Sequence, residues 1–162
     1  MHKKQMSLQI EPTGGPLGAI VTGIDLATPV APEDQSRLMV AWRHHLLLIF
    51  PGQNLTQSQH LAAAKLFGEP VVSGNKAYFE RTGTSEFMVA EHPEISVVHN
   101  IGEEGRVVRR NNALGSDEID WHSDNSYLDN PPLGSMLYGK TIPDLGGDTG
   151  QLHLPPRQKA QQ

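Results

Sequence analysis

Two different hydrophobic periods follow one another in the first third of the chain. Residues 8–26 alternate short apolar stretches with Gly and Pro, which predicts two short strands joined by a turn. A helical spacing then begins near Pro32, where Pro and the acids that follow it suit the first turn of a helix. Its buried face is predicted to carry Leu38, Ala41, Trp42, His45 and Leu46. Residues 47–50 are predicted to form a buried strand, which Pro51 and Gly52 would stop.

A second helix is predicted from its start signal. Thr56 suits the N-cap position, and Gln59 stands where a capping box requires it. The apolar face of this helix would comprise Ala63, Leu66 and Phe67, and Gly68 would end it. Further along, residues 71–93 lack a clear period and are predicted to be loop, while residues 95–100 alternate well enough to predict a strand.

Composition narrows the class of protein. A length of 162 residues is typical of a single domain. The net charge of −5 disfavours a nucleic-acid partner. Because there is no cysteine, any metal must be held by His and carboxylate side chains. The longest strongly apolar run, residues 46–50, is far too short to span a bilayer, and no apolar segment follows the basic N-terminus. We therefore expect a cytoplasmic protein without a membrane partner.

The candidate chemistry centres on His122 and Asp124. On an extended strand, residues two apart point to the same side, so this pair would present an imidazole and a carboxylate to one point. That is two thirds of the two-His, one-carboxylate arrangement that suits non-haem Fe(II). The alternative is a strand-end His that forms a hydrogen bond to a nearby turn. His44 and His45, by contrast, are expected to be helix-end surface and core contact rather than a ligand pair.

The motifs after this pair occur in a specific order. Residues 122–124 (His-Ser-Asp) are followed by residues 130–132 (Asn-Pro-Pro) and by a strand-like segment at 134–138. Residues 143–150 then contain Gly-Gly-Asp-Thr. This order closely resembles the taurine dioxygenase (TauD/TfdA) family of Fe(II)/2-oxoglutarate-dependent dioxygenases.

The N-terminal half resembles the same family. Residues 18–26 are similar to its opening strand and turn, and residues 43–50 to its segment of Arg and His before an apolar strand. Residues 67–70 (Phe-Gly-Glu-Pro) are similar to the end of its second helix. The resemblance covers roughly residues 8–150, and we expect residues 1–150 to form the N-terminal part of a TauD/TfdA-like dioxygenase domain.

The resemblance implies a fold, a metal and a cosubstrate. The fold would be α+β: a partial double-stranded β-helix (jelly roll) with flanking N-terminal helices. His122 and Asp124 would be Fe(II) ligands, and Thr149 would help to hold the distal carboxylate of 2-oxoglutarate. The reaction would hydroxylate a small organic, often anionic, substrate and release succinate and CO2. The sequence does not indicate which substrate is hydroxylated, nor whether the chain forms a homo-oligomer.

The family's second metal His and its 2-oxoglutarate Arg lie well beyond the Gly-Gly-Asp-Thr motif, whereas this chain ends twelve residues after Gly150. Residues 151–162 do not resemble the family, and Pro155 and Pro156 predict a disordered tail. We therefore expect a C-terminally truncated chain, which a frameshifted or mis-spliced gene model explains with one event, whereas a naturally shortened protein needs two coincidences. His153 and Arg157 have the right chemistry to replace the missing pair, but a Pro-rich tail offers no rigid support.

Three functional hypotheses follow. The first is a dioxygenase by lineage whose catalysis is impaired in this truncated chain. The second is a catalytically inert fragment or interaction protein that binds no metal. The third is a different mononuclear metal enzyme of the cupin type, which the Gly-Gly-Asp-Thr motif disfavours. Metal binding that needs both His122 and Asp124 separates the first hypothesis from the second.

Overall fold

Helices and strands are both present, in an α+β arrangement. A computed structural model of the chain defines two helices and five strands among the residues that it describes. The chain divides into two units, the first formed by residues 1–54 with 138–162 and the second by residues 55–137. The described residues are 7–72, 80–81, 83, 88–99, 122, 124, 129–142, 144 and 149–152.

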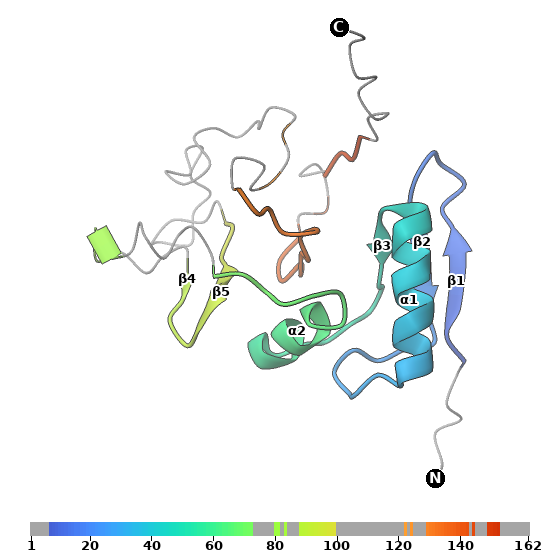
Figure 1. Cartoon of the computed structure of the whole chain (residues 1–162), viewed down its shortest axis with the longest axis horizontal. Coiled ribbons are helices and arrows are strands. Elements are labelled where there is room, and N and C mark those ends of the chain that lie inside the picture. The colour runs from blue at the N-terminus through green and yellow to red at the C-terminus, as the bar shows by residue number, and fades with distance from the viewer. Residues whose placement is uncertain are drawn as a thin grey trace, which may run out of the picture. The chain divides into compact units, whose positions relative to one another are not determined.

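The first unit contains a three-stranded sheet and a helix (Figure 1). Strands β1 (Gln9–Pro12) and β2 (Ala19–Thr22) pair antiparallel, as the alternating N-terminal pattern predicts. Strand β3 (Leu48–Ile49) pairs parallel with β2, and helix α1 (Pro32–His45) connects the two. A crossover is required there because parallel neighbours cannot be joined by a tight turn. Both predicted strands and the predicted helix are thereby confirmed.

The core of this unit lies between α1 and the sheet. Leu38 of α1 is fully buried, and Ala19 and Val21 alternate with exposed residues along β2, as expected for a strand with one covered face. The segment after β2 is fixed by Gln53, a residue distant in sequence. The Gln53 side chain accepts a hydrogen bond from the Leu26 amide at 2.9 Å. The same side chain donates to the Ile24 carbonyl at 3.2 Å, so one residue fixes this connection at two points.

The end of α1 differs from the prediction. The helix ends at His45, and Leu46 adopts a left-handed conformation with φ of 64°. Leu46 is therefore not part of the buried face, and half of its surface is exposed. The strand that follows is shorter than the predicted residues 47–50, and Ile49 is 42% exposed. Among the described strands, this two-residue strand pairs with β2 alone, so it is an edge rather than a buried strand.

The second unit contains helix α2 (Gln57–Ala64) and a two-stranded sheet. The predicted capping box is confirmed: Thr56 Oγ1 accepts from the Gln59 amide, and the Gln59 side chain accepts from the Thr56 amide. The helix ends earlier than the predicted Gly68. Beyond it, the amides of Leu66 and Phe67 donate hydrogen bonds to the carbonyls three residues before them, Ala63 and Ala64, so the α-helical pattern stops.

The two-stranded sheet was only partly predicted. Strands β4 (Met88–Val89) and β5 (His92–Ser96) form an antiparallel hairpin. Residues 71–93 were predicted as loop, so the first strand and the start of the second were missed, and the predicted strand at 95–100 lies too far along the chain. Pro93 obscured the pattern, yet a hairpin strand leaves the amide positions on its outer edge unpaired, where Pro is tolerated. His92 Nε2 lies 3.0 Å from Ser58 Oγ and links β5 to α2.

The capping box gives a direct test of the start of α2. Replacing Thr56 by Ala removes the side-chain acceptor of the Gln59 amide, so we expect the free energy of unfolding to fall by about 1 kcal/mol. Thr56→Ser keeps the acceptor and serves as the matched control. Urea denaturation monitored by circular dichroism measures both variants. An equal loss in the two variants would contradict a role for the hydroxyl.

The described residues also bear on two further predictions, the strand at 134–138 and the jelly roll. Residues 134–138 are described and form no strand, so that strand prediction is wrong. The α+β class is confirmed, whereas the described elements are two small sheets and do not by themselves make a jelly roll. Within the described residues, no helix has the length and apolar character needed to cross a membrane.

Candidate metal centre

The structure brings the side chains of His122 and Asp124 together. His122 Nε2 lies 3.2 Å from Asp124 Oδ1, and both side chains are more than half exposed, at 56% and 55%. Neither residue is assigned to a strand; Asp124 lies in a turn. The predicted convergence of an imidazole and a carboxylate is therefore present, although neither of these two described residues lies in a strand.

The carboxylate of Asp124 has a second contact. Ser135 Oγ donates a hydrogen bond to Asp124 Oδ2 at 2.9 Å. The two carboxylate oxygens thus face different partners, one the His122 imidazole and the other a hydroxyl. Ser135 was not among the site residues predicted from the sequence. Its only signal was the Gly-Ser pair after the Pro-Pro turn, which we interpreted as the start of a strand.

The spacing of the two donor atoms fits a metal ion. Two donors that bind one ion at about 2.1 Å and at right angles are separated by about 3 Å. The observed 3.2 Å between Nε2 and Oδ1 is close to that separation. The exposure of both side chains leaves the outer side of the pair open to an ion and to small molecules. Without an ion, the same contact is an ion pair when the imidazole is protonated.

A complete ligand set is not found among the described residues. No group of three or more His, Asp or Glu side chains there is arranged to hold a metal ion. Thr149, the predicted 2-oxoglutarate residue, is described and exposed, and it belongs to the first unit. His153 and Arg157 lie outside the described residues, as does the predicted tail beyond residue 152.

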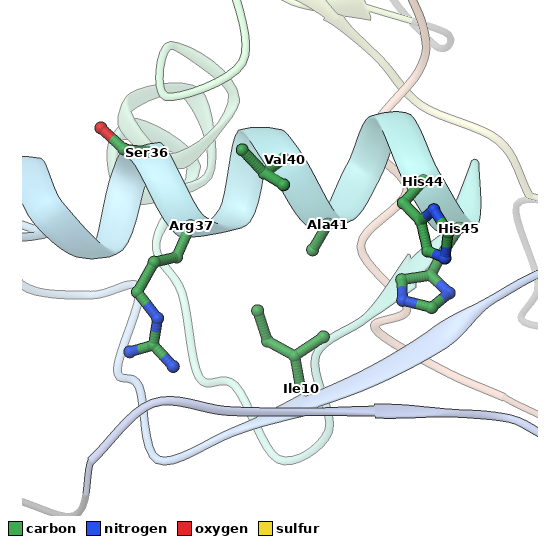
Figure 2. Close-up of a pocket in the computed structure, with 7 residues that line it drawn as sticks. All are labelled: Ile10, Ser36, Arg37, Val40, Ala41, His44 and His45. Atoms are coloured by element: carbon green, nitrogen blue, oxygen red, sulfur yellow. The ribbon is translucent and has the colours of Figure 1, made fainter.

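A second His pair is chemically different from this site. The rings of His44 and His45 meet edge to face, with centroids 4.7 Å apart. They line a shallow cavity of about 430 Å³ beside α1 (Figure 2). The cavity has a largely apolar lining, and its lining residues include no carboxylate: Ile10, Ser36, Arg37, Val40, Ala41, His44 and His45. An anionic ligand for Fe(II) is thus missing from this lining.

The segment that carries Ser135 is held by α2. The His60 imidazole of α2 forms a hydrogen bond to the backbone of Met136, the residue after Ser135. Burial lowers the pKa of His60 below its ordinary value of 6.5, and this hydrogen bond offsets part of the shift. His60 is therefore neutral in the folded chain at pH 7.

The lowered pKa of His60 makes stability depend on pH. The unfolded chain takes up the His60 proton at a higher pH than the folded chain does, so protonation favours unfolding. The contribution is fully present above about pH 6.5 and is lost as the pH falls from there toward the folded-state pKa.

Urea denaturation between about pH 7.5 and 5.5 measures this effect. His60→Gln is expected to flatten the dependence of stability on pH relative to the wild type, whereas His44→Gln, at an exposed position, is expected to retain it. Identical pH profiles for His60→Gln and the wild type would contradict the assignment.

The chain is similar to known proteins along most of its length. The family described as "Taurine catabolism dioxygenase TauD, TfdA family" matches residues 9–151. A (S)-phenoxypropionate/alpha-ketoglutarate-dioxygenase of Delftia acidovorans is 34% identical over 152 residues, which cover 90% of this chain and 46% of that protein. An alpha-ketoglutarate-dependent 2,4-dichlorophenoxyacetate dioxygenase of Cupriavidus pinatubonensis is 31% identical over 148 residues, covering 89% and 49%.

Solved structures were also found. A taurine dioxygenase from Burkholderia xenovorans is 29% identical, with a TM-score of 0.42 over 54% of this chain and 27% of the other. The chain spans about half the length of the curated relatives that it matches. The resemblance inferred from the ordered motifs is confirmed by the match over residues 9–151.

Proposed function

Because the chain belongs to the TauD/TfdA family of dioxygenases, we propose that it supplies part of an Fe(II)/2-oxoglutarate-dependent dioxygenase site. The family and the curated relatives are alpha-ketoglutarate-dependent oxygenases, which use Fe(II) and 2-oxoglutarate. The observation that carries the proposal is the 3.2 Å approach of His122 Nε2 to Asp124 Oδ1 within the matched region. The distance between these two predicted ligands is close to the separation of two adjacent donors on one ion, and this supports the proposal.

His122 and Asp124 would hold Fe(II) at two adjacent positions. The imidazole supplies a neutral donor, and the carboxylate supplies a charge that offsets that of the ion. Bound Fe(II) supplies the activation of O2 that couples the oxidation of 2-oxoglutarate to the hydroxylation of a C–H bond. The overall reaction takes up O2 and 2-oxoglutarate and yields the alcohol, succinate and CO2. The exposure of the pair leaves room for the cosubstrate beside the ion.

Thr149 would bind the distal carboxylate of 2-oxoglutarate. Its hydroxyl can donate one hydrogen bond to a carboxylate oxygen, and it is exposed in the structure. A single neutral donor holds a dianion weakly, so a cationic partner is expected to contribute as well.

The substrate class is proposed to be a small organic anion. Curated relatives are named for (S)-phenoxypropionate, for 2,4-dichlorophenoxyacetate and, in Pseudomonas putida, for sulfate esters. These molecules share an anionic group near an oxidisable C–H bond. The basic residues that we considered for recognising an anion, Arg106, Arg109 and Arg110, lie outside the described residues. We propose that the chain acts in the cytoplasm.

An anaerobic titration with Fe(II) and 2-oxoglutarate tests the proposed function. When 2-oxoglutarate chelates protein-bound Fe(II), a metal-to-ligand charge-transfer band develops that neither free component gives. Thr149→Val should raise the 2-oxoglutarate concentration needed for half of this band about tenfold, because a hydrogen bond to a charged group is lost. The Fe(II) affinity of this variant should be unchanged.

Thr22→Val is the matched control, since Thr22 is an exposed threonine of β2 in the same unit. It should titrate like the wild type. Equal titrations of Thr149→Val and the wild type would remove Thr149 from the site. A wild-type chain that develops no band at high Fe(II) would contradict the dioxygenase proposal and favour an inert fragment.

A further inference from the structure

The two oxygens of the Asp124 carboxylate are kept distinct by their contacts. Oδ2 accepts a hydrogen bond from Ser135 Oγ at 2.9 Å, while Oδ1 lies 3.2 Å from His122 Nε2. The terminal torsion of an aspartate is broad and roughly two-fold, so an exposed carboxylate with no other restraint would exchange its oxygens freely. The hydroxyl removes that freedom and leaves Oδ1 on the imidazole side.

We propose that Ser135 is a positioning residue, which orients Asp124 so that only Oδ1 is presented to the metal ion. This inference rests on the proposed function. With Oδ2 bonded to the Ser135 hydroxyl, Asp124 would hold the ion through Oδ1. Partners of this kind typically change metal affinity by 10- to 100-fold when they are removed.

The support for Ser135 comes from α2. The Met136 backbone, one residue beyond Ser135, forms a hydrogen bond to the His60 imidazole. His60 stands inside α2, whose start is fixed by the capping box of Thr56 and Gln59. A regular element thus restrains the irregular segment that carries Ser135 and Met136. The chain of contacts from His60 through Met136 and Ser135 to Asp124 lies entirely within the second unit.

Titration of the 162-residue chain with Mn(II) tests this role, with the free ion counted by electron paramagnetic resonance. This method measures weak binding and requires neither turnover nor 2-oxoglutarate. Ser135→Ala should raise the dissociation constant for Mn(II) about tenfold, whereas Ser135→Thr keeps the hydroxyl and should stay within about threefold of the wild type. A role in structure alone would not be rescued in this way, and thermal unfolding of both variants checks that the fold is retained.

Two further variants make the outcomes distinguishable. Ser36→Ala removes a helical hydroxyl that donates to the Pro32 carbonyl, and it should bind Mn(II) like the wild type. Asp124→Ala should lose binding. If Asp124→Ala loses binding but Ser135→Ala matches the wild type, the positioning role is overturned and the proposed function stands. If the wild type binds no better than Asp124→Ala, the proposed function fails and the role of Ser135 fails with it.

Discussion

Asp124→Ala is expected to weaken Fe(II) binding to the chain by about a hundredfold or more, because it removes the anionic ligand of the proposed centre. His122 would then be left as a single neutral donor, which binds a divalent ion poorly. The exposed Asp124 side chain contributes little to stability, so the variant should fold normally. Anaerobic equilibrium dialysis against Fe(II) measures the affinity, and circular dichroism checks the fold.

Two matched variants separate ligation from charge. Asp129→Ala removes an exposed carboxylate from the same unit and should bind Fe(II) like the wild type. Asp124→Asn keeps an oxygen donor of the same shape without the charge, and its affinity should fall between those of Asp124→Ala and the wild type. Equal losses in the Asp124 and Asp129 alanine variants would indicate a general charge effect and count against a centre at Asp124.

Leu38→Ala should have the largest effect on stability. Leu38 is fully buried on the face of α1 that covers the sheet, so truncation removes its apolar surface and leaves a cavity. We expect the free energy of unfolding to fall by about 3 kcal/mol. Urea denaturation followed by far-ultraviolet circular dichroism measures this loss.

Val40→Ala provides the control on the same helix. Val40 is 68% exposed, so its truncation should change the free energy of unfolding by no more than about 0.5 kcal/mol. Similar small changes in both variants would show that α1 is not packed through Leu38. A loss at Val40 as large as that at Leu38 would mean that the exposed side of α1 is covered in solution.

Local signals predicted much of the fold. The helical period placed α1, and the Thr56–Gln59 pair placed the start of α2, because both depend on residues that are close in sequence. The left-handed turn at Leu46 was missed, since helices usually reserve that conformation for Gly. Strand β4 and the start of β5 were missed because these strands are short and Pro93 breaks the alternation.

Only part of the candidate site was predictable from the sequence. Two residues separated by one position can converge by local geometry alone, so His122 and Asp124 were accessible from spacing. Ser135 was not, because its contact with Asp124 spans eleven positions and depends on how the segment after the Pro-Pro turn is held. The His60 contact that holds this segment spans an even longer stretch of chain. Such tertiary contacts leave no periodic signal in a sequence.

The central claim is that His122 and Asp124 together hold a metal ion. The most direct measurement is a Mn(II) titration in which nuclear magnetic resonance resolves the histidine ring protons, because a bound paramagnetic ion broadens only its neighbours. The His122 ring is expected to broaden at the lowest Mn(II) concentration, and this selectivity is expected to disappear in Asp124→Ala. The His44 and His45 rings serve as the internal reference, since they form a close pair without a carboxylate in their cavity lining. Broadening of that pair before His122, or equal broadening of all rings, would contradict the claim.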